Sequence, residues 1–333
     1  MYSVHQHWDP LKVCVVGRSW PPEFYSWIQV PHVRNLFEKI AIETEEDYQA
    51  IISKLQQFGV EVLRPNLPEP HIQYGRYAMP PMSPRDGLIM IGNTLHHNGN
   101  HEDPTNYLNC YKHILDHVEQ QGNQIKPSPQ WVNGAMCTRV GRDLYFGTYK
   151  DEPFDQIQQH VTHEFDQYRT HVIKTDGHTD GTFCPVAPGL IISLRDIPTY
   201  KETFPDWEVV YLPGQSWAQV GGWLDLKYRN SGKWWIPGFE QDQDVIDTVE
   251  QWLGHWTGYV EETVFDVNML VIDPNNVIVF NYNKQVFDAL ERYSITPHIV
   301  TFRHRYFWDG GIHCVTTDLH REGDLKDYFT ERG

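Results

Sequence analysis

Residues 139–175 read RVGRDLYFGTYKDEPFDQIQQHVTHEFDQYRTHVIKT. Strand-forming residues on either side of Gly141 predict a β-hairpin over 139–147. The segment 154–168 is predicted to be helical, and HVIKT at 171–175 is predicted to be a further strand. Strand, strand, helix and strand in that order form one ββαβ unit.

The same order of elements recurs along the chain. Strands are predicted at 12–17, 86–92, 182–194 (two strands broken at Pro188-Gly189), 207–212 and 298–302, with a hairpin at 266–280. Helices are predicted at 104–122, at 283–295 and at 44–59, where Thr44 is the expected N-cap and Gly59 the end. Units of about 50 to 70 residues in series indicate an α/β fold built from a repeated module rather than one doubly wound sheet.

Composition narrows the class of protein. The 333 residues are 40% hydrophobic and 21% charged, which fits a globule with a sizeable core. The formal net charge of -17 disfavours nucleic-acid and anionic-membrane partners, and no apolar run is long enough to span a bilayer. Five scattered cysteines without a CxxC pair, and an N-terminus without a signal-peptide pattern, indicate the reducing cytoplasm.

Residues 1–333 are predicted to form a single domain with one unusual segment. Residues 214–262 are rich in tryptophan, glycine and acids, including SWAQVGGWLDLKYRNSGKWWIPGFEQD. So many aromatic residues are uncommon in a disordered region, so we expect an ordered insertion or lid packed by its tryptophans.

Cys314 is the candidate nucleophile, in DGGIHCVTTDLHR at 309–321. A nucleophilic cysteine needs access and a nearby base. Gly310 and Gly311 are expected to let the backbone bend tightly and to keep bulk away from the thiol. The alternative is a small buried apolar cysteine with a packing role.

His178 and Asp180 are the candidate partners, in the segment TDGHTDG. Residues i and i+2 of an extended segment face the same side, so both side chains are expected to project into one pocket. A polar surface turn is the alternative. A metal site is not expected, because the chain has no HxH, HExxH or CxxC spacing.

Two further polar residues stand beside predicted strands. Asp86 opens an apolar strand, where an acid is otherwise a common turn former, and Asn133 precedes Gly134 ahead of a hairpin, where Asn-Gly is a strong turn signal.

Taken in order, six segments resemble the glycine amidinotransferase family of the pentein superfamily. They are HWDPLKVCVVGR (7–18), PRDGLIMIGN (84–93), VGRDLYFG (140–147), GHTDGTFCPVAPGLIIS (177–193), FDVNMLVID (265–273) and GGIHCVTTDLHREGDLKDY (310–328). The histidine and cysteine segments are the most specific, and the matches cover nearly the whole chain.

The resemblance implies a five-bladed α/β propeller of ββαβ modules around a central active-site channel. It implies that Cys314 is the nucleophile, His178 the general acid/base, and Asp86 and Asp180 the carboxylates that hold the guanidinium of L-arginine. An amidino-cysteine intermediate would pass its amidino group to an amine. Glycine, the default acceptor, would give guanidinoacetate and ornithine, with no cofactor.

The sequence departs from the family pattern at two places. Asn133 stands where the family has an acid that orients the histidine; its carbonyl can still accept a hydrogen bond and hold the ring. Ile197 aligns with the arginine that binds the substrate carboxylate, and Arg195, two residues away, is the expected substitute. His313, beside the nucleophile, is assigned to substrate binding.

Three functions remain open from the sequence. The first is amidinotransfer from arginine to an amine. The second is hydrolysis of arginine by water, as in deiminases and dihydrolases of the same superfamily. The third is arginine binding without catalysis, which Asn133 suggests. All three imply small-molecule partners and neither nucleic acid nor membrane, and a homodimer is a candidate assembly.

Overall fold

The computed structural model describes residues 1–332 apart from Tyr74, 99–103, Lys150, Asp176, 195–199, 213–235, Glu240, His255 and 257–263. Arg195, Ile197 and most of the tryptophan-rich segment therefore lie outside the described residues. The described parts of that segment include α8 (Gln243–Thr248), the π-helical turn η3 (Val249–Leu253) and Trp256, which packs in the core.

Five three-stranded sheets account for most of the strands. The first contains β17 (Thr316–Arg321), β1 (Leu11–Val16) and β2 (Glu61–Leu63), and the second β5 (Leu88–Ile91), β6 (Thr94–His97) and β7 (Gln124–Pro127). The third contains β8 (Cys137–Val140), β9 (Asp143–Thr148) and β10 (Arg169–Lys174). The fourth contains β11 (Phe183–Ala187), β12 (Leu190–Ser193) and β13 (Glu208–Tyr211), and the fifth β14 (Leu270–Asp273), β15 (Asn276–Val279) and β16 (Thr296–Ile299).

Each sheet repeats one topology. Its first two strands are antiparallel, and its third strand runs parallel to the second after a helical crossover, as the geometry of parallel pairing requires. The crossovers carry α1 (Pro31–Gln57), α3 (Pro104–Gln120), α4 (Phe154–Glu164), α5 (Tyr200–Thr203) and α9 (Lys284–Arg292). The predicted ββαβ repeat is confirmed.

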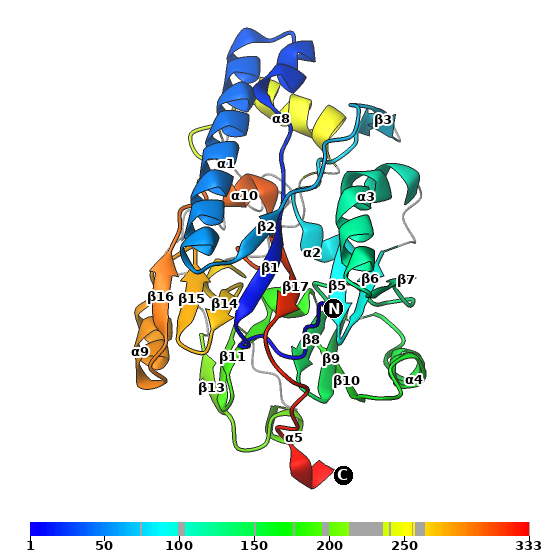
Figure 1. The fold of residues 1–333 in the computed structure, drawn as a ribbon. Helices are drawn as coiled ribbons and strands as arrows, with labels where there is room; N and C mark the ends of the chain where they lie inside the picture. Colours follow the sequence, from blue (N-terminus) through cyan, green and yellow to red (C-terminus); the bar gives the residue numbers. More distant parts are fainter. Residues whose placement is uncertain are drawn as a thin grey trace.

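The first sheet joins the two ends of the chain. Its leading strand, β17, comes from the C-terminal region and pairs antiparallel with β1, with Cys14 opposite Asp318. Figure 1 shows β1 and β17 side by side in the middle of the molecule, with the other sheets on both sides. The α/β class is confirmed, while the arrangement of the sheets about a pseudo-fivefold axis stays a prediction.

Smaller elements complete the part of the chain that the structure describes. They are the turns η1 (Pro22–Trp27), η2 (Thr179–Gly181), η4 (Val264–Asp266) and η5 (Thr330–Arg332), the short helices α2 (Pro84–Gly87) and α10 (Arg305–Trp308), and a two-stranded sheet of β3 (Ile72–Gln73) and β4 (Arg76–Tyr77).

The predicted helix start at Thr44 is wrong. The helix α1 begins at Pro31, and Thr44 is buried in its interior, where its hydroxyl accepts a hydrogen bond from Trp308 Nε1 at 2.9 Å. A threonine suited to capping is used instead for tertiary packing. The predicted end is confirmed, because α1 stops at Gln57 and Gly59 has a φ of +74°.

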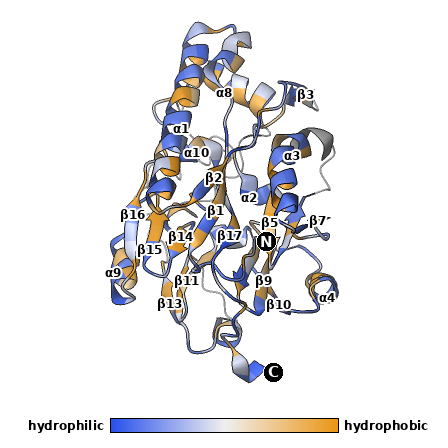
Figure 2. Ribbon diagram, in the orientation of Figure 1, coloured by the Kyte–Doolittle hydropathy of each residue, from blue (hydrophilic) through white to orange (hydrophobic). Residues whose placement is uncertain are grey.

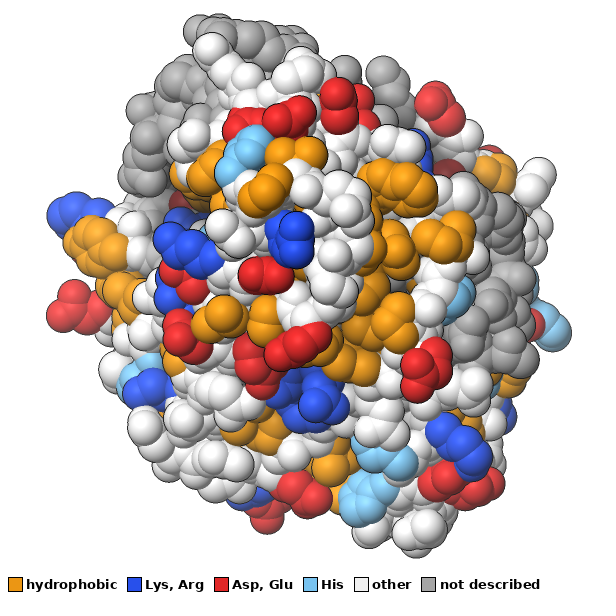
Figure 3. All heavy atoms as spheres, turned by 90° about the horizontal axis from the view of Figure 1, so that it is seen from above, with side chains coloured by type: hydrophobic (Ala, Val, Ile, Leu, Met, Phe, Trp, Pro, Cys, Tyr) orange, Lys and Arg blue, Asp and Glu red, His pale blue; other side chains and the backbone are white. Residues whose placement is uncertain are grey.

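Apolar residues gather on the strands and on one side of the helices, as Figure 2 shows. The largest buried cluster packs α1 against β1, β14 and β15, and contains Trp256 and Trp308. The face in Figure 3 mixes acidic, basic and apolar side chains, so the net negative charge does not form a single patch there. No helix among the described residues has the length and apolarity needed to cross a bilayer.

Candidate active site

Five of the predicted site residues lie in turns, or in a short helix, that precede the first strand of a sheet. Asp86 is in α2 before β5, and Asn133 precedes β8. His178 and Asp180 lie at η2 before β11, and Cys314 lies in the turn before β17. Because the sheets share one topology, we expect these turns to lie at equivalent ends of their sheets.

The Cys314 sulfur lies among polar groups from η2 and from the segment before β14. Its thiol is 3.5 Å from Asp180 Oδ2, and Asn268 Nδ2 donates to the sulfur at 3.0 Å. Only 9% of the residue is exposed. Burial, followed by the negative charges of Asp180 and Asp86, raises the pKa of the thiol well above its usual value, while the backbone of Gly311 opposes this. The resting sulfur is therefore a thiol unless a cation enters.

Asp180 has one occupied and one free oxygen. Its Oδ2 accepts a hydrogen bond from His313 Nδ1 at 2.9 Å, whereas Oδ1 is buried and has no partner among the described residues. Burial raises the pKa of this carboxyl, but the hydrogen bond from His313, with His178 and Arg85 nearby, outweighs it and lowers the pKa. Asp180 is thus an ionised acceptor with unused capacity.

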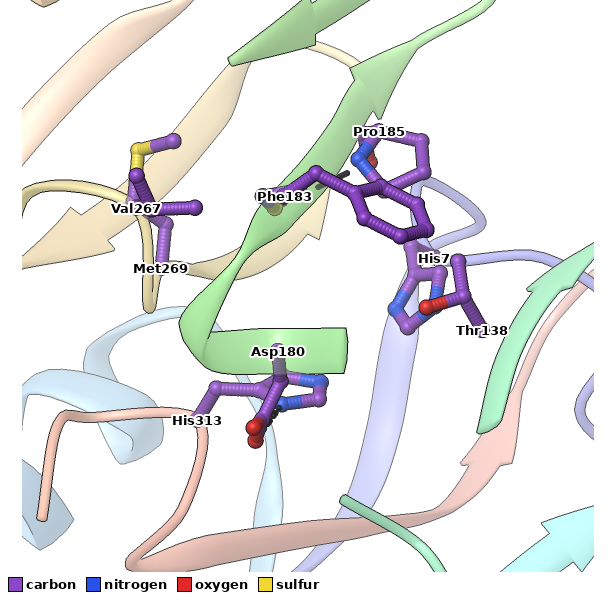
Figure 4. Close-up of a pocket in the computed structure, with 9 residues that line it drawn as sticks. His7, Thr138, Asp180, Phe183, Pro185, Val267, Met269 and His313 are labelled. Atoms are coloured by element: carbon purple, nitrogen blue, oxygen red, sulfur yellow. Dashed lines mark hydrogen bonds and ion pairs between the residues drawn. The ribbon is translucent and has the colours of Figure 1, made fainter. Parts of the chain in front are cut away.

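His313 supports Asp180 from the side. Burial, with Arg85 nearby, lowers the pKa of His313 to about 4, so at neutral pH the ring is uncharged and Nδ1–H is the donor. Figure 4 shows the ring lying against the Asp180 carboxylate. Beyond this pair is a cavity of about 10 Å³, room for about one water molecule, lined also by His7 and Thr138.

Asp86 and His178 complete the charged group. Asp86 is partly exposed; burial and then the like charge of Asp180 raise its pKa to about 6, although His178 and Arg85 pull it down. His178 interacts electrostatically with both acids. The structure thus brings Cys314, Asp180, Asp86 and His178 into one neighbourhood.

The extended conformation predicted for 178–180 is wrong. His178 is extended at φ -60° and ψ 139°, but a 3-10 turn begins at Thr179. The Gly181 N–H and the Thr182 hydroxyl both donate to the His178 carbonyl, at 3.2 and 2.9 Å. Local hydrogen bonds by threonine favour this turn over extended chain.

Asn133 has a local partner. Its Oδ1 accepts the N–H of Met136 at 2.9 Å, and among the described residues it has no hydrogen bond to His178. The segment nevertheless adjoins η2, because the Thr179 hydroxyl donates to Ala135 O at 2.7 Å. A Cβ on Gly134 would lie 2.3 Å from Arg85 O, so this glycine permits close packing under the turn that carries Asp86.

Asn268 was not singled out from the sequence, although it stands in the quoted segment 265–273. It is 1% exposed, and its Oδ1 accepts the backbone N–H groups of His313 and Cys314 at 2.7 and 3.1 Å. Its Nδ2 donates to Asp180 O and to the Cys314 sulfur, each at 3.0 Å. The available signal was a polar residue within an apolar strand segment.

A buried charge cluster under the site was also missed. Asp318, fully buried in β17, accepts hydrogen bonds from Arg85 Nη1 at 2.9 Å, Arg139 Nη2 at 2.8 Å and Arg321 Nε at 2.7 Å. Arg85 Nε also donates to the carbonyls of His313 and Thr316. The cluster thereby ties the turn of Asp86 to the turn of Cys314.

The expected reason for the glycine pair needs correction. Neither Gly310 nor Gly311 has a positive φ, so the turn does not depend on glycine's backbone freedom. A Cβ on Gly311 would instead lie 2.3 Å from Asn268 Oδ1 and 2.5 Å from Asn268 Cβ. Gly311 makes room for the Asn268 side chain.

One group of potential metal ligands occurs among the described residues. His32, Asp242 and Asp244 bring ligand atoms within 4.8 Å of one another at the surface. Asp242 caps α8 through the N–H of Val245 and contacts His32 Nε2 at 3.0 Å, so the arrangement has a structural explanation.

Comparisons with known proteins agree with the resemblance. No family model matches the chain. Inosamine-phosphate amidinotransferase 1 of Streptomyces glaucescens is 21% identical over 387 residues, which cover 98% of this chain and 99% of that protein. Mitochondrial glycine amidinotransferase of Xenopus tropicalis is 20% identical over 98% of this chain and 84% of its own length. The solved inosamine-phosphate amidinotransferase of Streptomyces griseus matches with a TM-score of 0.69 at 20% identity, over 98% of this chain and 99% of the other.

Homologues of this chain are therefore amidinotransferases, a class of transferase, and the solved relative shares its fold. The resemblance that the six sequence segments carry is confirmed.

Proposed function

Because its full-length relatives are amidinotransferases, we propose that this chain moves the amidino group of L-arginine to an acceptor amine through a covalent intermediate on Cys314. The observation that supports this most directly is the Cys314 sulfur 3.5 Å from the carboxylate of Asp180, whose second oxygen is buried and has no hydrogen-bond partner in the described part of the chain.

A guanidinium suits these acceptors. It is a planar cation with several N–H donors, and a charge-assisted hydrogen bond to a buried carboxylate contributes roughly 1.5–3 kcal/mol. Asp180 Oδ1 and the carboxylate of Asp86 are the proposed acceptors. A cation held between them offsets the two negative charges that raise the pKa of the Cys314 thiol. The substrate therefore helps to ionise the nucleophile.

The proposed chemistry has two halves. In the first, the Cys314 thiol gives its proton to His178 and the thiolate attacks the guanidinium carbon. A C–S bond forms, and the bond to the ornithine nitrogen breaks as His178 passes that proton to the nitrogen. In the second, an acceptor amine attacks the amidino carbon and gives a proton to His178. The C–S bond then breaks and returns the thiolate.

Glycine is the proposed acceptor, which would give guanidinoacetate and ornithine. The glycine amidinotransferase of Xenopus tropicalis supports glycine, while the Streptomyces relatives are named for inosamine phosphate, so the acceptor pocket decides the product. Arg195 is proposed to bind the substrate carboxylate, and Asn133 to orient His178. The five free cysteines support the proposed cytoplasmic location.

The test is the mass of the protein after incubation with arginine alone. The expected result is a gain of one amidino group, CH2N2, on the tryptic peptide of residues 306–321, in which Cys314 is the only cysteine. Glycine should discharge the adduct as guanidinoacetate. Cys314→Ala should give no adduct but still bind arginine.

Other outcomes identify the alternatives. Formation of citrulline or ammonia without an acceptor would indicate hydrolysis. Arginine binding with neither adduct nor turnover, across several amines, would indicate a binding protein. Retained turnover in Cys314→Ala would remove the sulfur from its proposed role.

A further inference from the structure

The amide of Asn268 has only one orientation that satisfies its surroundings. Its Oδ1 faces two backbone donors, the N–H groups of His313 and Cys314. A flipped amide would point its NH2 group at these donors and lose both hydrogen bonds. Nδ2 must therefore face the other side, where the Asp180 carbonyl and the Cys314 sulfur accept.

The Nδ2–H group of Asn268 donates to a sulfur that lies near three negatively charged side chains, and these charges oppose ionisation of the thiol. Asp180 from η2, Asp86 from α2 and Asp309 from the end of α10 all place negative charge near the thiol. Within the described residues, Asn268 is the side chain that donates a hydrogen bond to the sulfur. A hydrogen bond to a charged acceptor is worth more than one to a neutral acceptor, so this contact strengthens when the thiolate forms.

The backbone beside Asn268 is shaped to admit it. A Cβ on Gly311 would overlap Oδ1, Cγ and Cβ of Asn268 at 2.3–2.5 Å, so the whole side chain would have to move. At the preceding glycine, Gly310, the nearest atom is Val315 Cγ1 at 3.1 Å, and the next lie at 3.8 Å or more. Only the second glycine of the pair depends on Asn268.

We propose that Asn268 is a further catalytic residue, which stabilises the Cys314 thiolate through Nδ2–H and fixes its turn through Oδ1, and that Gly311 is glycine so that Asn268 can reach the sulfur. The inference rests on the proposed function only in taking Cys314 as the reacting group.

Ionisation of the thiol can be measured without substrate. The rate of alkylation of Cys314 by iodoacetamide is followed from pH 6 to 12 by mass spectrometry of the peptide 306–321; the range extends upward because the pKa of this thiol is raised well above its usual value. The midpoint of the pH profile reports ionisation, while the plateau rate reports access. If a hydrogen bond of the usual strength to the thiolate is lost, the thiol ionises less readily. Alkylation at a fixed pH below the midpoint should then be about tenfold slower.

Three variants remove the contact in different ways. Asn268→Asp keeps an oxygen for the two backbone donors but loses the N–H, Asn268→Ser shortens the side chain, and Gly311→Ala displaces Asn268 without changing it or adding charge. Each is expected to move the midpoint to higher pH and to slow alkylation at pH 8 at least about tenfold.

Two controls match these changes. Asn123→Asp alters another buried amide, which bridges Tyr2 and Asn93 through backbone groups away from the sulfur. Gly310→Ala adds a methyl group to the same turn without contacting Asn268. Both are expected to keep the wild-type midpoint.

Unfolding would be recognised by its opposite effect. It exposes the four other buried cysteines to the reagent and speeds alkylation of Cys314. A wild-type midpoint in both Asn268→Ser and Gly311→Ala would overturn the proposal. If the midpoints move as expected but arginine leaves no adduct, the inference stands and the proposed function fails.

Discussion

Replacing Asp86 by asparagine is expected to weaken arginine binding and, at the same time, to stabilise the substrate-free protein. Asp86 is held near the like-charged Asp180 without arginine to compensate, and its pKa is raised from 3.8 to about 6. A carboxylate placed to receive a cation is unfavourable until the cation arrives. Asparagine keeps the shape of the side chain and removes the charge.

The stability effect follows from proton linkage. A carboxyl whose pKa is higher in the folded than in the unfolded protein disfavours folding wherever it is ionised in both states, here above about pH 6. The penalty is relieved as the pH falls from 6 to 4, because the folded state takes up the proton first. The shift corresponds to about 3 kcal/mol, which solvent at the partly exposed carboxylate reduces to roughly 2 kcal/mol. Asp86→Asn should therefore raise the free energy of unfolding by this amount at pH 7 and leave it unchanged below pH 4.

The binding effect has the opposite sign. With a pKa of about 6, Asp86 is almost fully ionised at pH 8 but only about one tenth ionised at pH 5, so arginine should bind about tenfold more weakly at pH 5. Asp86→Asn should weaken binding at pH 8 by about 10- to 100-fold, the value of a charge-assisted hydrogen bond.

Isothermal titration with arginine in a Cys314→Ala background measures binding without turnover, and urea unfolding of the same proteins measures stability. Asp116→Asn, which changes an exposed acid on α3 paired with Lys112, is the matched control and should change neither by much. If Asp86→Asn binds arginine as tightly as its parent, or is less stable at pH 7, the proposed role of Asp86 is wrong.

Three other changes have defined outcomes. Asp318→Asn should lower the free energy of unfolding, measured in urea at pH 7, by about 3–5 kcal/mol, because it leaves arginines buried without their counter-ion. The loss should shrink below pH 4, since those arginines, despite burial, hold the pKa of Asp318 well below its usual range. Asn133→Asp should keep the hydrogen bond from the Met136 N–H and raise turnover near pH 7 by placing a negative charge near His178. Unchanged turnover would show that residue 133 only stabilises its own turn. Thr179→Val should lower turnover severalfold through loss of the 2.7 Å hydrogen bond to Ala135 O; thermal unfolding checks that the fold persists.

The hairpins were predictable because their signals are local. Gly141 and Gly189 have positive φ at the turns of β8–β9 and β11–β12, where the sequence placed them. The start of α1 was not predictable in this way. Thr44 has the side chain of a good N-cap, but its hydroxyl accepts a hydrogen bond from Trp308, which is distant in the sequence, and the helix continues through Thr44.

The charge cluster was hidden for a similar reason. The sequence around Asp318 shows one acid and Arg321 near it, which suits a surface strand. Arg85 comes from the short helix α2 and Arg139 from β8, and only their joint burial shows that the acid is the centre of the cluster. The ionic groups that tie the turn of Cys314 to the turn of Asp86 are therefore a tertiary property.

The role of Asn268 was partly predictable, because its position within the ββαβ repeat matches the positions of other proposed site residues. Asp86 stands two residues before β5, Asn268 two residues before β14, and Cys314 two residues before β17. In sheets of one topology, equal offsets from the leading strand place side chains at equivalent points, so aligning the repeats groups Asn268 with the proposed nucleophile and the proposed guanidinium ligand. The fourth repeat fits less closely, since Asp180 stands three residues before β11, where the 3-10 turn shortens the chain path. The repeat that begins with β8 is the exception, since Ala135 stands two residues before that strand and Asn133 four. In the other four repeats the polar positions just before the leading strand are where this fold gathers its proposed chemistry, and Asn268 is found there by the same reasoning that finds Cys314.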